Sequence, residues 1–121
     1  MAEYSVSGIV VKGDGLAKNF GYPTANLDIS LDKFDLASGV YACIAYLENI
    51  QYNAVAIIKR NESKFEVHLI GYDGLDFYMK QVSINLLSKV SDIEKKDGQE
   101  LIDKIESDMK KVFDYFSRKI Q

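Results

Sequence analysis

Short runs of apolar, β-branched and aromatic residues, separated by polar turns, occupy most of the first two-thirds of the chain, which is the pattern of β-strands. Residues 65–70 also alternate, with Phe65 and Val67 on one face and Glu66 on the other. The pattern predicts strands at Tyr4–Val11, Gly39–Leu47, 52–58, 65–70 and 77–87, the second and third joined by a polar turn at 48–51. Short strands at this spacing are typical of a closed barrel or a sandwich.

The last quarter of the chain changes period. From Leu101 onward the apolar residues recur three or four positions apart, as on one face of an α-helix. Asp97 can serve as the N-cap, and Glu100 three residues later resembles a capping box. We expect this helix to pack over the barrel rather than to bind a membrane or a partner. The stripe consists of Leu101, Ile102, Ile105, Met109, Val112, Phe113, Phe116 and Ile120.

Composition narrows the class of protein. The chain has 121 residues, 47% hydrophobic and 27% charged, which predicts one globular domain over residues 1–121. A net charge of −3 argues against nucleic-acid binding, and a single cysteine and a single histidine exclude an intrachain disulfide and a multi-histidine metal centre. No apolar run approaches the roughly 20 residues that span a bilayer, and no signal peptide is evident. We therefore expect a cytoplasmic protein that binds no membrane.

Residues 12–27 form a long loop in this scheme, with three of the eight glycines and the only proline, Pro23. Glycines let backbone amides approach an anion, although they also simply form turns. Neither a Walker A motif nor a dinucleotide fingerprint is present. After Pro23, Thr24 and Asn26 place a hydroxyl and an amide oxygen on one side. Such oxygens can complete the shell of a cation bound mainly by phosphate and water, or can merely close a turn.

These residues carry a resemblance to a known family. The segments GIVVKG (8–13) and GYPTANL (21–27), with Gly15 between them, resemble the opening of riboflavin kinases. GVYA at 39–42, EVHL at 66–69 and DFY at 76–78 are similar to later segments of the family, and Asp108 resembles the aspartate of its I-x-x-D. The resemblance covers nearly the whole chain, in order.

The resemblance implies a mainly β fold, a six-stranded antiparallel Greek-key β-barrel with a C-terminal α-helix. It implies transfer of the γ-phosphoryl group of ATP to the 5′-hydroxyl of riboflavin, giving FMN and ADP, with Mg²⁺ or another divalent cation. It also implies a monomer. In many bacteria the module is fused to a nucleotidyltransferase domain that makes FAD. Because 121 residues are too few to include that domain, we expect a separate FAD-forming adenylyltransferase as a working partner.

Site roles follow by the same resemblance. Thr24 and Asn26 would hold the metal, and Glu66, which we expect to be partly exposed, would deprotonate the ribityl hydroxyl. Without the family, an edge-strand charge that discourages aggregation is the preferred interpretation of this carboxylate. His68 shares its face, and a structural or solvated role is expected for it. The nucleotide site would be lined by Gly13, Gly15, Lys18, Gly21, Pro23 and Thr24.

Three segments depart from the family pattern. Residues 57–63 lack its glycine and proline, Met79 stands where a glycine is expected, and residues 87–92 offer Lys89 in place of a forked arginine. Basic residues at 59, 60 and 64 could face phosphate or simply solvent. The first hypothesis is an active kinase. The alternatives are a non-catalytic flavin- or nucleotide-binding module and a structural β-barrel interaction domain.

Overall fold

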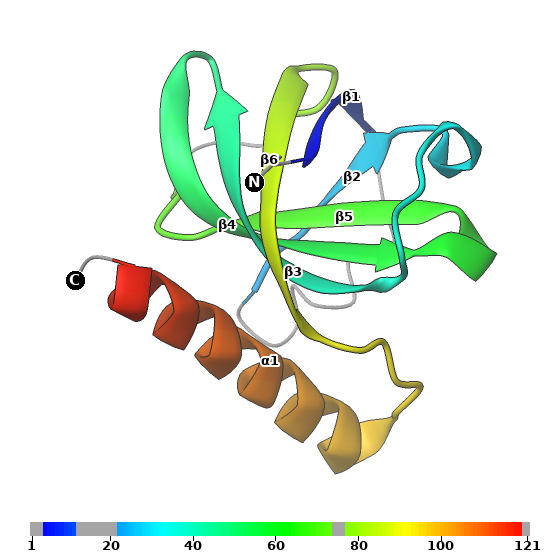
Figure 1. Cartoon of the computed structure of the whole chain (residues 1–121), viewed down its shortest axis with the longest axis vertical. Helices are drawn as coiled ribbons and strands as arrows, with labels where there is room; N and C mark the ends of the chain where they lie inside the picture. Colours follow the sequence, from blue (N-terminus) through cyan, green and yellow to red (C-terminus); the bar gives the residue numbers. More distant parts are fainter. Residues whose placement is uncertain (1–3, 12–21, 74–76, 120–121) are drawn as a thin grey trace.

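The computed structural model describes residues 4–11, 22–73 and 77–119, and in these residues six strands close into an antiparallel barrel with one helix outside it (Figure 1). Around the barrel the strand order is β1-β2-β5-β4-β3-β6. Strands β3 to β6 therefore follow the Greek-key order 6-3-4-5, which confirms the expected fold. The elements are β1 (Tyr4–Val11), β2 (Ala25–Asp28), β3 (Gly39–Leu47), β4 (Ile50–Lys59), β5 (Lys64–Leu69), β6 (Gln81–Ser91) and α1 (Gly98–Lys119), with short 3-10 turns at Leu31–Lys33 and Arg60–Glu62.

Strands β1 and β3 have the predicted bounds, and β4 and β5 differ from prediction by one or two residues. The prediction for β6 was wrong by four residues at each end, because the strand is Gln81–Ser91 rather than 77–87. The turn between β3 and β4 is tighter than predicted, because Glu48 and Asn49 both adopt positive φ, 52° and 68°, as a two-residue hairpin turn requires. The prediction of a loop through residue 27 was wrong. Residues Ala25–Asp28 form β2, which pairs with β1 on one side and β5 on the other.

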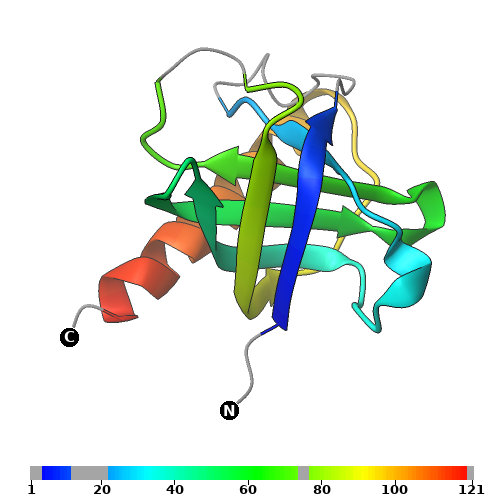
Figure 2. The same ribbon diagram turned by 90° about the horizontal axis from the view of Figure 1, so that it is seen from above.

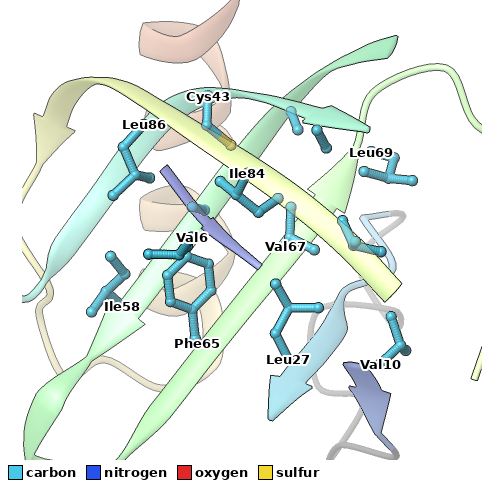
Figure 3. Close-up of a cluster of buried hydrophobic side chains, with 14 of the residues drawn as sticks. Val6, Val10, Leu27, Cys43, Ile58, Phe65, Val67, Leu69, Ile84 and Leu86 are labelled. Atoms are coloured by element: carbon cyan, nitrogen blue, oxygen red, sulfur yellow. The ribbon is translucent and has the colours of Figure 1, made fainter. Parts of the chain in front are cut away.

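The barrel interior is filled by the apolar face of each strand (Figure 3). Phe65 and Val67 of β5 are each 1% exposed and point inward, as the alternation predicts. Cys43 of β3 is buried in the same cluster, and burial raises the pKa of its thiol far above the ordinary range. The thiol is therefore a packing group with no access to a substrate.

A second apolar cluster lies outside the barrel, between the helix and the sheet. Met109 and Val112 of α1 pack against Val40, Ala42 and Val55 of β3 and β4. Figures 1 and 2 both show α1 running along this side of the barrel. The helix therefore packs as predicted. In the part of the chain that is described, no helix is long and apolar enough to cross a membrane.

A nearly buried ion pair fixes the helix to the sheet. The Lys104 ammonium donates to both carboxylate oxygens of Asp108, at 2.8 and 2.6 Å, with the two side chains 14% and 12% exposed. The same ammonium donates to the Ser91 hydroxyl at the end of β6 and to the Asp92 carbonyl, each at 2.8 Å. Asp108 was singled out by its resemblance to the family motif. In the structure it pairs with Lys104, and this pair holds α1 in place against the end of β6.

Met79 lies in the turn before β6 in a left-handed conformation, with φ 68°, and its side chain is 77% exposed. A side chain at positive φ costs about 1–2 kcal/mol, and this one recovers little by packing. We expect Met79→Gly to raise the free energy of unfolding by about 0.5–1 kcal/mol in urea denaturation. The exposed neighbour Tyr78 has no positive φ, so Tyr78→Gly should lower stability. Equal effects of the two changes would contradict the argument from φ.

Candidate functional site

The residues of the candidate site meet on the outer face of β2 and β5. Asn26 of β2 is the direct cross-strand partner of Glu66 of β5. Directly opposed residues of an antiparallel pair lie on the same face, with Cβ atoms about 4.5–5.5 Å apart. Because Phe65 and Val67 point into the barrel, Glu66 and Asn26 both face outward. The register thus places a carboxylate and an amide side by side.

Glu66 is only 6% exposed, although it faces away from the barrel interior. The expectation of a partly exposed carboxylate was therefore wrong. Its other cross-strand partner is Ile57 of β4, which packs in the cluster beneath α1. The edge-strand interpretation was also wrong, because β5 pairs with β2 and with β4 and the barrel is closed. Glu66 is thus a buried acid on a strand that is paired on both sides.

The Asn26 side chain is unusual in its hydrogen bonding. Its Nδ2 atom is buried, and among the described residues it has no hydrogen-bond partner. A buried polar atom left unsatisfied costs about 1–3 kcal/mol, so such atoms are rare and point to a missing partner. Since the two ends of an amide differ only by a flip, the unsatisfied end can present oxygen or nitrogen. Asn26 is therefore suited to receive a ligand beside Glu66.

His68 links β5 to the segment just before β2. Its Nδ1 atom lies 2.7 Å from the Pro23 carbonyl oxygen, so Nδ1 carries the proton and donates it. The Tyr22 ring meets the imidazole edge-on, with centroids 5.7 Å apart. Burial lowers the pKa of His68, and the hydrogen bond to Pro23 partly offsets this. The imidazole is thus neutral near pH 7, and its role is structural rather than solvated.

The predicted nucleotide and metal residues divide into two groups. Pro23 is exposed and Thr24 half-buried in the short segment before β2, while Asn26 lies within the strand. The structure therefore brings Asn26 to the side of β5 that holds Glu66, with Thr24 two residues earlier in the chain. Gly13, Gly15, Lys18 and Gly21 lie outside the described residues, as does Asp76.

Arg60 has a structural role, which differs from both interpretations that the sequence left open, a basic side chain facing phosphate or solvent. Its guanidinium Nη1 donates to the carbonyls of Phe34 and Leu36, at 2.9 and 2.8 Å, and its backbone N–H donates to the Ser38 hydroxyl. Arg60 therefore holds the segment that precedes β3 in place. The sequence offered no signal for this, because the carbonyls it satisfies belong to residues more than twenty positions away.

Replacing Arg60 tests this role. Arg60→Met keeps the aliphatic stem and removes both donated bonds, leaving two carbonyls without their donor. We expect the free energy of unfolding to fall by about 1–3 kcal/mol, measured by urea denaturation. Lys59→Met, on the neighbouring basic residue, serves as the matched control and should change stability by less than about 0.5 kcal/mol. Loss of nucleotide binding without loss of stability would instead restore the phosphate-facing role.

Lys89 forms a surface ion pair. Its ammonium lies 2.9 Å from Asp92 Oδ1, and Asp92 raises the pKa of Lys89. The stem of Lys89 passes over Gly39, where a Cβ atom would come within 2.6 Å of the lysine Cε. Lys89 is thus occupied by Asp92 and does not reproduce a planar arginine fork.

Comparison with known proteins decides the family. The family model described as "Flavokinase: Riboflavin kinase" matches residues 1–116. The chain belongs to the riboflavin kinase family. The "Bifunctional riboflavin kinase/FMN adenylyltransferase" of Bacillus subtilis (strain 168) is 31% identical over 124 residues, which cover 94% of this chain and 39% of the relative. The chain thus spans well under half the length of that relative.

Solved structures agree on the fold. The crystal structure of riboflavin kinase from Trypanosoma brucei superposes with a TM-score of 0.68 at 23% identity, covering 97% of this chain and 82% of that one. A structure titled as a macrolide-efflux protein from Streptococcus pneumoniae superposes with a TM-score of 0.77 at 30% identity, covering 90% of this chain and 38% of that one. The closed barrel with its C-terminal helix is therefore the fold of a riboflavin kinase.

Proposed function

We propose that this chain is an active riboflavin kinase, which transfers the γ-phosphoryl group of ATP to the 5′-hydroxyl of riboflavin and releases FMN and ADP. Family membership supports the reaction class. The observation that carries the proposal is the cross-strand pair of Glu66 and Asn26, a buried carboxylate beside an amide with an unpartnered atom.

Glu66 is the proposed general base. The ribityl hydroxyl gives its proton to the Glu66 carboxylate as its oxygen forms a bond to the γ-phosphorus. The bond from that phosphorus to the bridging oxygen breaks, and ADP leaves with the electron pair. A positioned base of this kind contributes typically about 10²- to 10⁴-fold to the rate. Phosphoryl transfer asks mainly for positioning and charge stabilisation, so one carboxylate suffices for the proton.

Thr24 and Asn26 are the proposed metal-holding residues. Among the described residues no group of three His, Cys, Asp or Glu side chains could hold a metal, so a cation here would be bound largely by phosphate and water. A hydroxyl and an amide oxygen suit Mg²⁺ or another divalent cation of that kind. The Asn26 amide fits this role only with its oxygen turned to the unpartnered buried end, because Nδ2 is a donor and does not bind a cation. When bound, the cation neutralises charge on the phosphates of ATP.

The remaining roles in the nucleotide site follow from family membership. We assign the phosphates of ATP to the segment containing Gly13, Gly15, Lys18 and Gly21, with Pro23 setting the direction of the chain into β2. Backbone amides in a glycine-rich segment are suited to hold phosphate. We further propose that the chain acts as a monomer in the cytoplasm and that an FAD-forming adenylyltransferase consumes its FMN.

Chromatography of flavins tests the proposal. Purified protein is incubated with riboflavin, ATP and Mg²⁺, with a parallel sample in excess EDTA. We expect FMN to form with Mg²⁺ and not with EDTA. Unchanged riboflavin together with saturable quenching of flavin fluorescence would instead support a non-catalytic binding module.

A further inference from the structure

The backbone pairing between β2 and β5 is short and ends at the start of β2, close to Pro23. The two strands pair only at Ala25 with Val67 and at Asn26 with Glu66. Two residues before Ala25 stands Pro23, which has no N–H to donate to a further rung. Beyond this last rung, the side chain of His68, next to Val67, donates from Nδ1 to the Pro23 carbonyl at 2.7 Å.

Thr24 is consequently held from both sides. On its C-terminal side, Ala25 is paired with β5. On its N-terminal side, the Pro23 carbonyl is bonded to His68, and Tyr22 meets the imidazole edge-on while packing in the apolar cluster beneath α1. The imidazole itself is half-buried.

We propose that His68 is a positioning residue for nucleotide binding, which fixes Thr24 through the Pro23 carbonyl so that its hydroxyl and the Asn26 amide face one cation. This inference rests on the proposed function, because it assigns Thr24 and Asn26 to the metal. His68 itself touches neither substrate nor metal in this account. A group held within about 0.5 Å by a surrounding hydrogen bond binds better than one that must be ordered on binding.

Two substitutions separate the hydrogen bond from the bulk of the side chain. His68→Leu fills the space on β5 without a donor, whereas His68→Asn keeps an N–H donor near the position of Nδ1. Asn53→Leu, at an exposed position of neighbouring β4, is the matched control for a new leucine on the sheet surface. Thermal melts of all variants establish that each is folded.

Calorimetry then compares ADP with Mg²⁺ and ADP in EDTA. The readout is the gain in affinity that Mg²⁺ confers, and riboflavin binding by fluorescence is measured in parallel. We expect His68→Leu to reduce the Mg²⁺-dependent gain about tenfold, a scale typical of lost outer-shell partners. His68→Asn should restore it to within about threefold of wild type, with riboflavin affinity unchanged throughout.

The possible results separate this inference from the proposed function. A gain in His68→Leu equal to that of wild type would overturn the positioning role. Equal losses in the leucine and asparagine variants would also overturn it, because they would show that imidazole packing and not the donated hydrogen bond matters. A wild-type protein that binds Mg-ADP in this way yet makes no FMN would refute the kinase proposal and leave the role of His68 standing.

Discussion

Glu66→Gln should lower kcat for FMN formation about 10²- to 10⁴-fold while leaving the affinities for riboflavin and Mg-ADP nearly unchanged. Glutamine keeps the shape of glutamate and one oxygen, but it cannot accept the hydroxyl proton. The side chain is 6% exposed on a strand paired on both sides, so the isosteric change opens no cavity. Steady-state kinetics and ligand titrations on the same preparation provide the measurement.

Glu62→Gln is the matched control for this change. Glu62 lies in the 3-10 turn just before β5, and its exposed carboxylate is 3.8 Å from the Lys64 ammonium. An exposed ion pair of this kind contributes at most about 1 kcal/mol to the free energy of unfolding. The kcat of Glu62→Gln should therefore stay within about twofold of the wild-type value. A folded Glu66→Gln protein that makes FMN at the wild-type rate would show that Glu66 is not the base.

Asn26→Leu should change stability and nucleotide binding in opposite directions. Leucine has the γ-branched shape of asparagine, although it is larger, and it removes the buried Nδ2 that lacks a partner. The free energy of unfolding without ligand should therefore rise by about 1–3 kcal/mol. Affinity for Mg-ADP should fall by roughly ten- to a hundredfold or more, because even outer-shell partners of a metal contribute that much. Calorimetry and urea denaturation measure the two effects.

Thr24→Val is the companion variant, since valine matches threonine in shape and lacks only the hydroxyl oxygen. It should weaken Mg-ADP binding in the same direction, with riboflavin affinity unchanged. If both variants bind Mg-ADP as wild type does, the Pro-Thr-Ala-Asn segment only closes a turn. A less stable Asn26→Leu protein would show that the amide has a partner in the free protein.

Much of the barrel could be predicted from the chain because its strands carry local signals. The apolar and β-branched runs of β1 and β3 predicted the bounds of both strands. Strand β2 carries no such signal, since its four residues ANLD are too few for a periodic pattern. It is a strand because β1 and β5 pair with it on both sides, and this long-range pairing cannot be read from composition.

The site divides in the same way. The family resemblance singled out Thr24, Asn26 and Glu66 individually as candidates. The alternation of residues 65–70 correctly predicted that Glu66 faces away from the barrel interior. Glu66 is buried although it faces out of the barrel, and no local pattern predicts this burial. Likewise, the hydrogen bond from His68 to Pro23 joins residues 45 positions apart. The sequence could therefore name these residues without indicating how they act on one another.

The central claim is that this chain moves the γ-phosphoryl group of ATP onto riboflavin. It is tested most directly by following ATP labelled with ³²P at the γ position in the presence of riboflavin and Mg²⁺. The account predicts that the label appears in FMN, with one ADP formed for each FMN. Label that stays in ATP or appears only as inorganic phosphate, with riboflavin unchanged, would contradict it.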